Sequence, residues 1–164
     1  CPTGPRFDHA MALDLAQASQ IVFLCGHYEG FDERIGQIIP EIRPVSLGDF
    51  VLTGGELPAL CILDAVTRLL PGAVKEFDSV SADSFFAGLL DYPHYTKPPV
   101  YRGLEVPPVL LSGHHGKVTR WRRLQALWRT WRLRPDLLAT APLDAQDRAW
   151  LAAFEAGQGP EELG

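Results

Sequence analysis

Two glycine-containing loops, each placed after a short apolar run, constrain the fold of this sequence most. The first spans 25–34 and contains Gly26 and Gly30, and the second spans 46–56 and ends in a Gly-Gly-Glu stretch followed by Leu-Pro. Glycine is required where the backbone turns with positive φ or lies against a ligand without an intervening Cβ. Strand-to-helix turns alone would explain either loop. Together, after neighbouring strands, the loops predict the walls of one small-molecule pocket.

The spacing of apolar residues predicts alternating helices and strands. Helical spacing over 7–18 precedes a continuous apolar run over 21–25, which is typical of a strand buried on both faces. A second short strand is expected over 41–47, and an apolar helix over 57–70. This alternation predicts an α/β domain with a mainly parallel sheet.

Periodicity is lost after this region, which predicts two domains. Beyond the break, 91–108 is irregular and rich in proline, whereas 117–131 and 143–156 have helical spacing. The predicted organisation is an α/β domain over 1–72, a linker over 73–82, and a small, mostly helical domain over 83–164.

Composition excludes several classes of protein. With 164 residues, 46% of them hydrophobic, the chain is expected to be soluble and globular, and no apolar run reaches the length of a membrane span. Three widely spaced cysteines without a Cys-x-x-Cys pair indicate neither a disulfide framework nor a zinc site, so a reducing cytosol fits best. The adjacent histidines at 114 and 115 lack carboxylate support for a metal.

Charge is distributed unevenly. The formal net charge is −5, yet 117–134 contains seven basic residues and no acidic one. Such a cluster on an acidic body predicts contact with phosphate, and a solvated helix face is the alternative. Four apolar residues at helical spacing in the same segment are interpreted as a core stripe rather than as base-stacking platforms: Trp121, Leu124, Trp128 and Trp131.

Five stretches occur in the order of a known set of signature sequences. They are 26–34, 48–58, 83–85, 89–98 and 106–113. These stretches resemble the bacterial tRNA (guanine37-N1)-methyltransferases of the SPOUT class. The resemblance implies a deep trefoil knot, which the sequence pattern alone would not predict. It further implies that the N-terminal part of the family is missing from this chain, which begins with Cys-Pro rather than Met.

The resemblance implies S-adenosylmethionine-dependent methyl transfer to N1 of the guanine at position 37, 3′ of the tRNA anticodon. N1 carries a proton and its lone pair is delocalised toward O6, so the reaction requires a base and a cation at O6. The family pattern places the base at Asp83 and the cation at Arg68. Without the resemblance, Asp83 would be interpreted as a helix N-cap and Arg68 as a helix-end charge.

Binding residues follow in the same way. For the cofactor, the matching positions are Gly26, Tyr28, Glu29, Gly30, Leu47, Gly48, Phe50, Leu52, Gly54 and Gly55. For tRNA, the resemblance and the basic segment indicate Ser84, Asp91, His94, Tyr95, Arg120, Arg122 and Arg123. A structural turn around Pro93 is the alternative for Asp91, His94 and Tyr95. Three positions depart from the family pattern: Phe50 replaces a usual Tyr, His27 a common Arg and His114 a common Asn.

The family also implies a cytoplasmic homodimer whose active site joins the cofactor loops of one subunit to the Asp83 segment of the other. The alternatives are another SPOUT RNA methyltransferase, acting on ribose or on a different base, and a catalytically inactive RNA-binding or dimerisation fragment. A class I Rossmann methyltransferase is disfavoured because no Gly-x-Gly-x-x-Gly follows the first strand. The isolated chain is expected to bind S-adenosylmethionine poorly, because a strand tip preceding Cys1 should line the cofactor.

Overall fold

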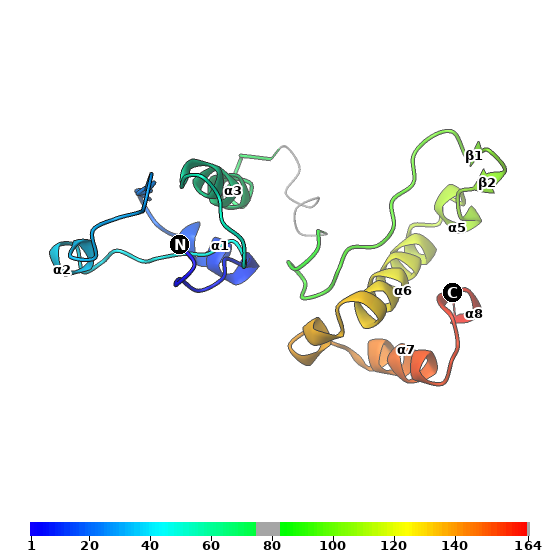
Figure 1. Cartoon of the computed structure of the whole chain (residues 1–164). Coiled ribbons are helices and arrows are strands. Elements are labelled where there is room, and N and C mark those ends of the chain that lie inside the picture. The colour runs from blue at the N-terminus through cyan, green and yellow to red at the C-terminus, as the bar shows by residue number, and fades with distance from the viewer. Residues whose placement is uncertain (75–82, 164) are drawn as a thin grey trace. The chain divides into compact units, whose positions relative to one another are not determined.

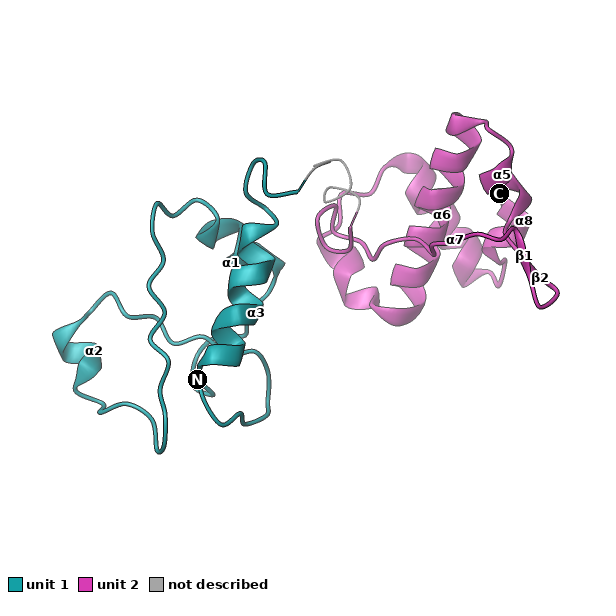
Figure 2. Ribbon diagram, turned by 90° about the horizontal axis from the view of Figure 1, so that it is seen from above, with its two compact units in different colours: residues 1–80 teal, residues 81–164 magenta. Residues whose placement is uncertain are grey.

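The chain divides into two compact units, Cys1–Val80 and Ser81–Gly164, which Figure 2 distinguishes by colour. The computed structural model describes residues 1–74 and 83–163. Each unit has its own hydrophobic cluster, so each is described by itself. Most of the linker predicted over 73–82 lies outside the described residues.

The described part of unit 1 contains the helices α1 (His9–Leu15), α2 (Ile35–Ile38) and α3 (Glu56–Thr67) (Figure 1). The helix α1 begins after Asp8, whose carboxylate accepts a hydrogen bond from a backbone N–H of the first turn. It packs against α3 around the buried side chains of Ala12, Ile62 and Val66. The longer two helices confirm the helical spacing predicted for this half of the sequence.

The apolar run over 21–25 differs from the prediction. Ile21 and Phe23 pack against the unit 1 core, whereas Val22 and Leu24 are 72% and 45% exposed. The run is therefore covered on one face only. No backbone hydrogen bond joins it to another described segment, and a strand exists only where such bonds pair it with a neighbour.

The backbone pairing that does occur in the described part of unit 1 is a single parallel bridge between Arg6 and Ser46. The N–H of Phe7 donates to the Ser46 carbonyl at 2.7 Å, and the N–H of Ser46 donates to the Pro5 carbonyl at 2.9 Å. One bridge does not make a sheet. The mainly parallel sheet predicted from sequence is thus not formed by the described residues, because 21–25 and most of 41–47 have no hydrogen-bonded neighbour there.

Unit 2 is built around one long helix, α6 (His115–Leu133). The pieces α5 (Pro108–Leu111), η1 (Pro135–Ala139), α7 (Ala145–Glu155) and α8 (Pro160–Leu163) all contact α6 (Figure 1). A short antiparallel hairpin, β1 (Val100–Tyr101) and β2 (Leu104–Glu105), precedes α5. Leu124, Leu127 and Phe154 form the centre of the core at 0–1% exposure. The helices predicted over 117–131 and 143–156 are confirmed.

A buried ion pair joins the middle of α6 to the start of α7. Asp147 is 1% exposed, and Arg123 donates to its two carboxylate oxygens at 3.1 and 2.6 Å. The same carboxylate accepts from the N–H of Asp144 at 3.1 Å, while the Asp144 side chain accepts from the N–H of Asp147 at 2.8 Å, so the two acids form a capping box. The hydrogen bond that Arg123 donates to Asp147 also raises the pKa of the Arg123 guanidinium.

A second buried polar group ties the segment before the hairpin to α6. Thr130 is fully buried, and its hydroxyl donates to the Ala126 carbonyl at 2.7 Å. The same oxygen accepts from the backbone N–H of Leu90 at 2.9 Å. One hydroxyl therefore fixes the chain immediately before Asp91 against the central helix.

We expect Asp147→Ala to lower the free energy of unfolding of unit 2 by about 2–4 kcal/mol, because it removes the cap of α7 and leaves a half-buried guanidinium without its partner. All four tryptophans lie in unit 2, so urea unfolding followed by tryptophan fluorescence reports on this unit alone. The matched control is Asp136→Ala, which breaks an exposed fork with Arg134 and should change little. Equal effects of the two substitutions would contradict the importance of the buried pair.

Candidate functional site

The two glycine loops of unit 1 lie against each other. A Cβ placed on Gly55 would lie 2.8 Å from the Cα of Cys25, a distance that real Cβ atoms do not adopt. Glycine is therefore needed at this position, because two backbones approach closely there. A second link joins the imidazole of His27 in the first loop to the carboxylate of Glu56, the first residue of α3.

The segment that begins at Cys1 completes this arrangement. Its terminal ammonium donates to the Val45 carbonyl at 2.7 Å, and Arg6 pairs with Asp49 at 3.0 Å. The hydroxyl of Ser46 folds the second loop by hydrogen bonds to the backbone of Gly48. Three segments, 1–7, 25–34 and 45–56, thus converge in unit 1.

The residues predicted to hold the cofactor lie on these segments, with most of their side chains directed to solvent. Tyr28, Phe50 and Leu52 are 103%, 59% and 41% exposed. Backbone conformation is unusual at the same place: Tyr28 and Gly30 have φ of 56° and 107°. A Cβ on Gly48 would lie 2.7 Å from the Phe50 ring, so this glycine permits the ring's position. The loops therefore present apolar side chains and bare backbone side by side.

Electrostatics at the loop contact centre on Glu56. A backbone hydrogen bond at Glu56 itself and then the hydrogen bond with His27 lower the pKa of this carboxyl. A carboxyl whose pKa is lowered in the folded state stabilises the fold fully at pH above its unfolded pKa, and this contribution is lost as the pH falls through the lowered value. The link between the loops is accordingly weakened in acid.

In unit 2, three of the predicted substrate residues, Ser84, Asp91 and His94, form one hydrogen-bonded cluster. The Asp91 carboxylate, 18% exposed, hydrogen-bonds to His94 Nε2 at 2.6 Å and accepts from the N–H of Tyr92 at 2.7 Å. Ser84 Oγ accepts from the N–H of Asp91 at 2.9 Å. The Arg122 guanidinium lies 4.8 Å from the centroid of the Tyr92 ring. The same hydrogen bonds also build a turn around Pro93. A purely structural role for Asp91 and His94, the alternative to substrate binding, therefore fits them as well.

The arginines of α6 differ from one another in their surroundings. Arg123 pairs with Asp147, and Arg134 with Asp136, so acids outside the segment supply the partners that 117–134 lacks. Arg120 donates to the Leu163 carbonyl at 3.3 Å. Arg123 thus has a structural role that the charge pattern did not predict.

The two predicted catalytic residues lie in different units. Arg68 is the residue at which α3 ends, so the helix-end position expected for it is confirmed. Asp83 is half-buried, and the residues after it, 84–87, form a turn rather than a helix. The interpretation of Asp83 as a helix N-cap is therefore wrong.

The described residues contain neither a metal-binding cluster nor a helix that could span a membrane. Over 1–74 and 83–163, no group of three or more His, Cys, Asp or Glu side chains is arranged to hold a metal ion. No helix in these ranges has the length and apolarity needed to cross a bilayer. His114 occupies the N-cap position of α6 without a side-chain hydrogen bond.

Comparison with known proteins agrees with this arrangement. A family model described as tRNA (Guanine-1)-methyltransferase TrmD matches residues 1–140. The chain belongs to this family. The SPOUT class of the family is consistent with an α/β fold.

Similar curated relatives are described as tRNA (guanine-N(1)-)-methyltransferases. The chain is 55% identical over 159 residues to that of Synechococcus sp. (strain JA-2-3B'a(2-13)), 53% over 158 residues to that of Moorella thermoacetica (strain ATCC 39073 / JCM 9320), and 50% over 155 residues to that of Bacillus subtilis (strain 168). The matches cover 97%, 96% and 94% of this chain and 63% of each relative. The chain thus spans less than two thirds of the length of these members of the family.

The sequence did not predict two features of the structure, the contact between His27 and Glu56 and the position of Trp121. Glu56 was expected only to open a helix, and its partner His27 was noted only as a departure from the family pattern. The signal in the sequence that could have predicted this pair is a histidine in one glycine loop and a carboxylate at the end of the other. The core stripe predicted for α6 is confirmed for Leu124, Trp128 and Trp131, whereas Trp121 is not among the side chains packed in that core.

We expect His27→Ala to raise the pKa of Glu56 part of the way toward its ordinary value, because the backbone hydrogen bond at Glu56 remains. A side-chain carbon NMR titration of the chain measures this change. The pKa of Asp136, lowered by its hydrogen bonds from Arg134 in the other unit, should be unaffected and serves as the internal control. An unchanged Glu56 pKa would show that the two loops are not linked through these side chains in solution.

Proposed function

We propose that the protein containing this chain transfers a methyl group from S-adenosylmethionine to N1 of the guanine at position 37 of tRNA. The observation that carries the proposal is the family match over residues 1–140, together with the relatives described as tRNA (guanine-N(1)-)-methyltransferases. The proposal includes a cytoplasmic homodimer and a SPOUT fold with a parallel sheet and a trefoil knot. It also assigns cofactor binding to 1–72 and tRNA binding to 83–164.

The chemistry of the converging loops fits the methyl donor. S-Adenosylmethionine, when bound, supplies a methyl group already activated on a sulfonium. Tyr28, Phe50 and Leu52 expose apolar surface that an adenine and an aliphatic chain would cover, which supports a binding role. Gly30 has open space where a Cβ would stand, so a ligand can approach the backbone of the first loop there. In this proposal, unit 1 binds and orients the donor.

Asp83 and Arg68 would supply the chemistry that guanine requires. The Asp83 carboxylate would accept the N1 proton, which would free the lone pair on N1 to bond to the methyl group while the methyl–sulfur bond breaks and the donor's sulfur leaves as a neutral thioether. The Arg68 guanidinium stabilises the negative charge that develops on O6, with a planar fork that suits an oxygen acceptor. The two residues belong to different units, and on the resemblance to the family the proposal assigns them to an active site shared between subunits.

Unit 2 supplies the features expected of a tRNA contact. The Ser84, Asp91 and His94 cluster presents an exposed imidazole, and Arg122 lies beside it over the Tyr92 ring. Since Arg123 pairs with a buried carboxylate, the electrostatic part of RNA binding is assigned instead to Arg122, Arg129 and Arg132.

We expect Asp83→Asn to reduce methyl transfer to a tRNA transcript on the order of a hundredfold or more, because the amide cannot accept the N1 proton. S-Adenosylmethionine and tRNA binding should be retained, since the side chain is nearly isosteric. Asp136→Asn is a control substitution of the same chemistry on the exposed surface of unit 2. Single-turnover assays that give Asp83→Asn the rate of the control would exclude Asp83 as the base.

We expect Arg122→Glu to weaken tRNA binding and to lower the slope of log K against log salt by roughly one unit, because one phosphate contact is lost. Filter binding over a range of salt concentrations measures both quantities. Arg148→Glu makes the same change of charge on the exposed surface of α7 and should leave the slope unchanged. Identical slopes for the two variants would place the RNA contact elsewhere.

A further inference from the structure

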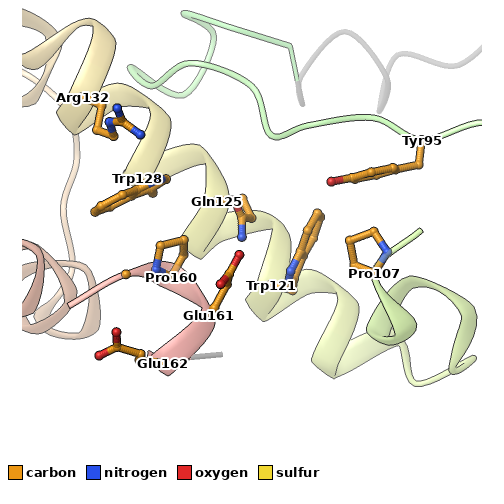
Figure 3. Close-up of a pocket in the computed structure, with 10 residues that line it drawn as sticks. Tyr95, Pro107, Trp121, Gln125, Trp128, Arg132, Pro160, Glu161 and Glu162 are labelled. Atoms are coloured by element: carbon orange, nitrogen blue, oxygen red, sulfur yellow. The ribbon is translucent and has the colours of Figure 1, made fainter. Parts of the chain in front are cut away.

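An open groove lined by aromatic side chains lies along the exposed side of α6. Tyr95, Trp121, Gln125, Trp128, Arg132 and Glu161 line this aromatic groove, whose volume is about 620 Å³ (Figure 3). The rings of Tyr95 and Trp121 lie 6.3 Å apart between centroids and are tilted by 54°. A volume of this size is typical of small-molecule sites. The groove lies wholly within unit 2.

The two tryptophans that line the groove differ in their relation to the core. Leu124 and Leu127 point into the core and have no exposed surface. Trp128 packs against this core, whereas Trp121 is not among the side chains packed there, and both line the groove from the same face of α6. Trp128 additionally contacts the core ring of Phe154 at 4.8 Å. Trp121 has no such core ring beside it among the described residues, so its indole is the available stacking surface.

Polar groups at the edges of the groove suit the remaining parts of a nucleotide. Figure 3 shows the Gln125 amide and the Glu161 carboxylate directed toward each other between the aromatic rings. An amide and a carboxylate together offer donors and acceptors to the edge of a base. The Arg132 guanidinium lies 5.6 Å from the centre of the Trp128 ring, at the same groove, and supplies positive charge for a phosphate.

We propose that the aromatic groove binds an unpaired nucleobase of the RNA substrate, stacked on Trp121, with its edge toward Gln125 and Glu161 and its phosphate toward Arg132. The proposal rests on the proposed function and extends it, since this base is additional to the methylated guanine. A duplex is excluded as occupant because its bases are already stacked and paired, so the groove selects a single-stranded nucleotide. A basic peptide is the competing occupant, because Glu161 and Glu162 line the groove beside Arg132.

Binding of two RNAs to the full chain tests the proposal: a hairpin with a single-stranded loop of anticodon sequence, and a blunt duplex of the same length. Stacking of one base contributes about 1–3 kcal/mol, so Trp121→Ala should weaken binding of the loop RNA roughly 5- to 100-fold. Binding of the duplex should be unchanged. The salt dependence should also be unchanged, because stacking releases no counterions. Trp121→Phe should restore most of the affinity, which a merely structural defect would not predict.

Leu133→Ala is the matched control, since Leu133 is an exposed apolar residue of the same helix outside the groove. Photocrosslinking with 5-bromouridine in the loop, followed by mass spectrometry, should label peptides containing Tyr95 or Trp121. Equal loop affinity for Trp121→Ala and Leu133→Ala, or crosslinks confined to other peptides, would overturn the proposal. So would a lysine-rich peptide that binds the groove while loop RNA does not.

Failure of the groove proposal is distinguishable from failure of the proposed function. If the wild-type protein methylates tRNA while Trp121→Ala binds loop RNA normally, the groove proposal alone fails. If the wild-type protein neither methylates nor binds tRNA, both fail.

Discussion

A carboxylate removed from water must be paired, and this constraint organises unit 2. Asp147 has almost no exposed surface, so its charge is tolerable only with the Arg123 fork and the Asp144 backbone around it. These bonds set where α7 begins and how it lies on α6. Once α7 and the core side chains cover part of α6, the rest of the helix surface is left to the aromatic groove, which begins at the edge of the core, and to arginines without buried partners.

Unit 1 is organised by a different constraint, the close approach of two backbones. With Gly55 against Cys25, the second loop leads directly into α3, and α3 in turn packs on α1. The loops are therefore held by helices at their base, while their outer side chains remain uncovered. A ligand that covered these exposed apolar side chains would be stabilised by their removal from water.

The sequence predicted the helices well and the strands poorly, for a physical reason. Helices such as α3 and α6 are specified by local spacing, whereas a strand depends on a partner that the local sequence does not contain. The run over 21–25 shows this, because it has the composition of a buried strand and no hydrogen-bonded neighbour in the described residues.

The site residues divide in a similar way. The loop positions could be found from glycine and from the family's signature stretches. The partner of Arg123 could not, because Asp147 is 24 residues distant and its burial follows from tertiary packing. Trp121 lies outside the packed core although its spacing matches that of Leu124 and Trp128, because a helical pattern does not show where the packed part of a helix face ends.

The hydroxyl of Thr130 has a consequence for which residues this position can accept. It is both donor and acceptor, to Ala126 and from Leu90, in a place closed to water. Valine has nearly the same shape, yet it would strand the Leu90 amide without a partner, whereas serine would keep both bonds and lose only a methyl group. Residues found at this position in natural sequences should therefore be chosen for hydrogen-bonding capacity rather than for size. A change to valine should release the segment that carries Asp91 and His94 from α6, while the helical core stays folded.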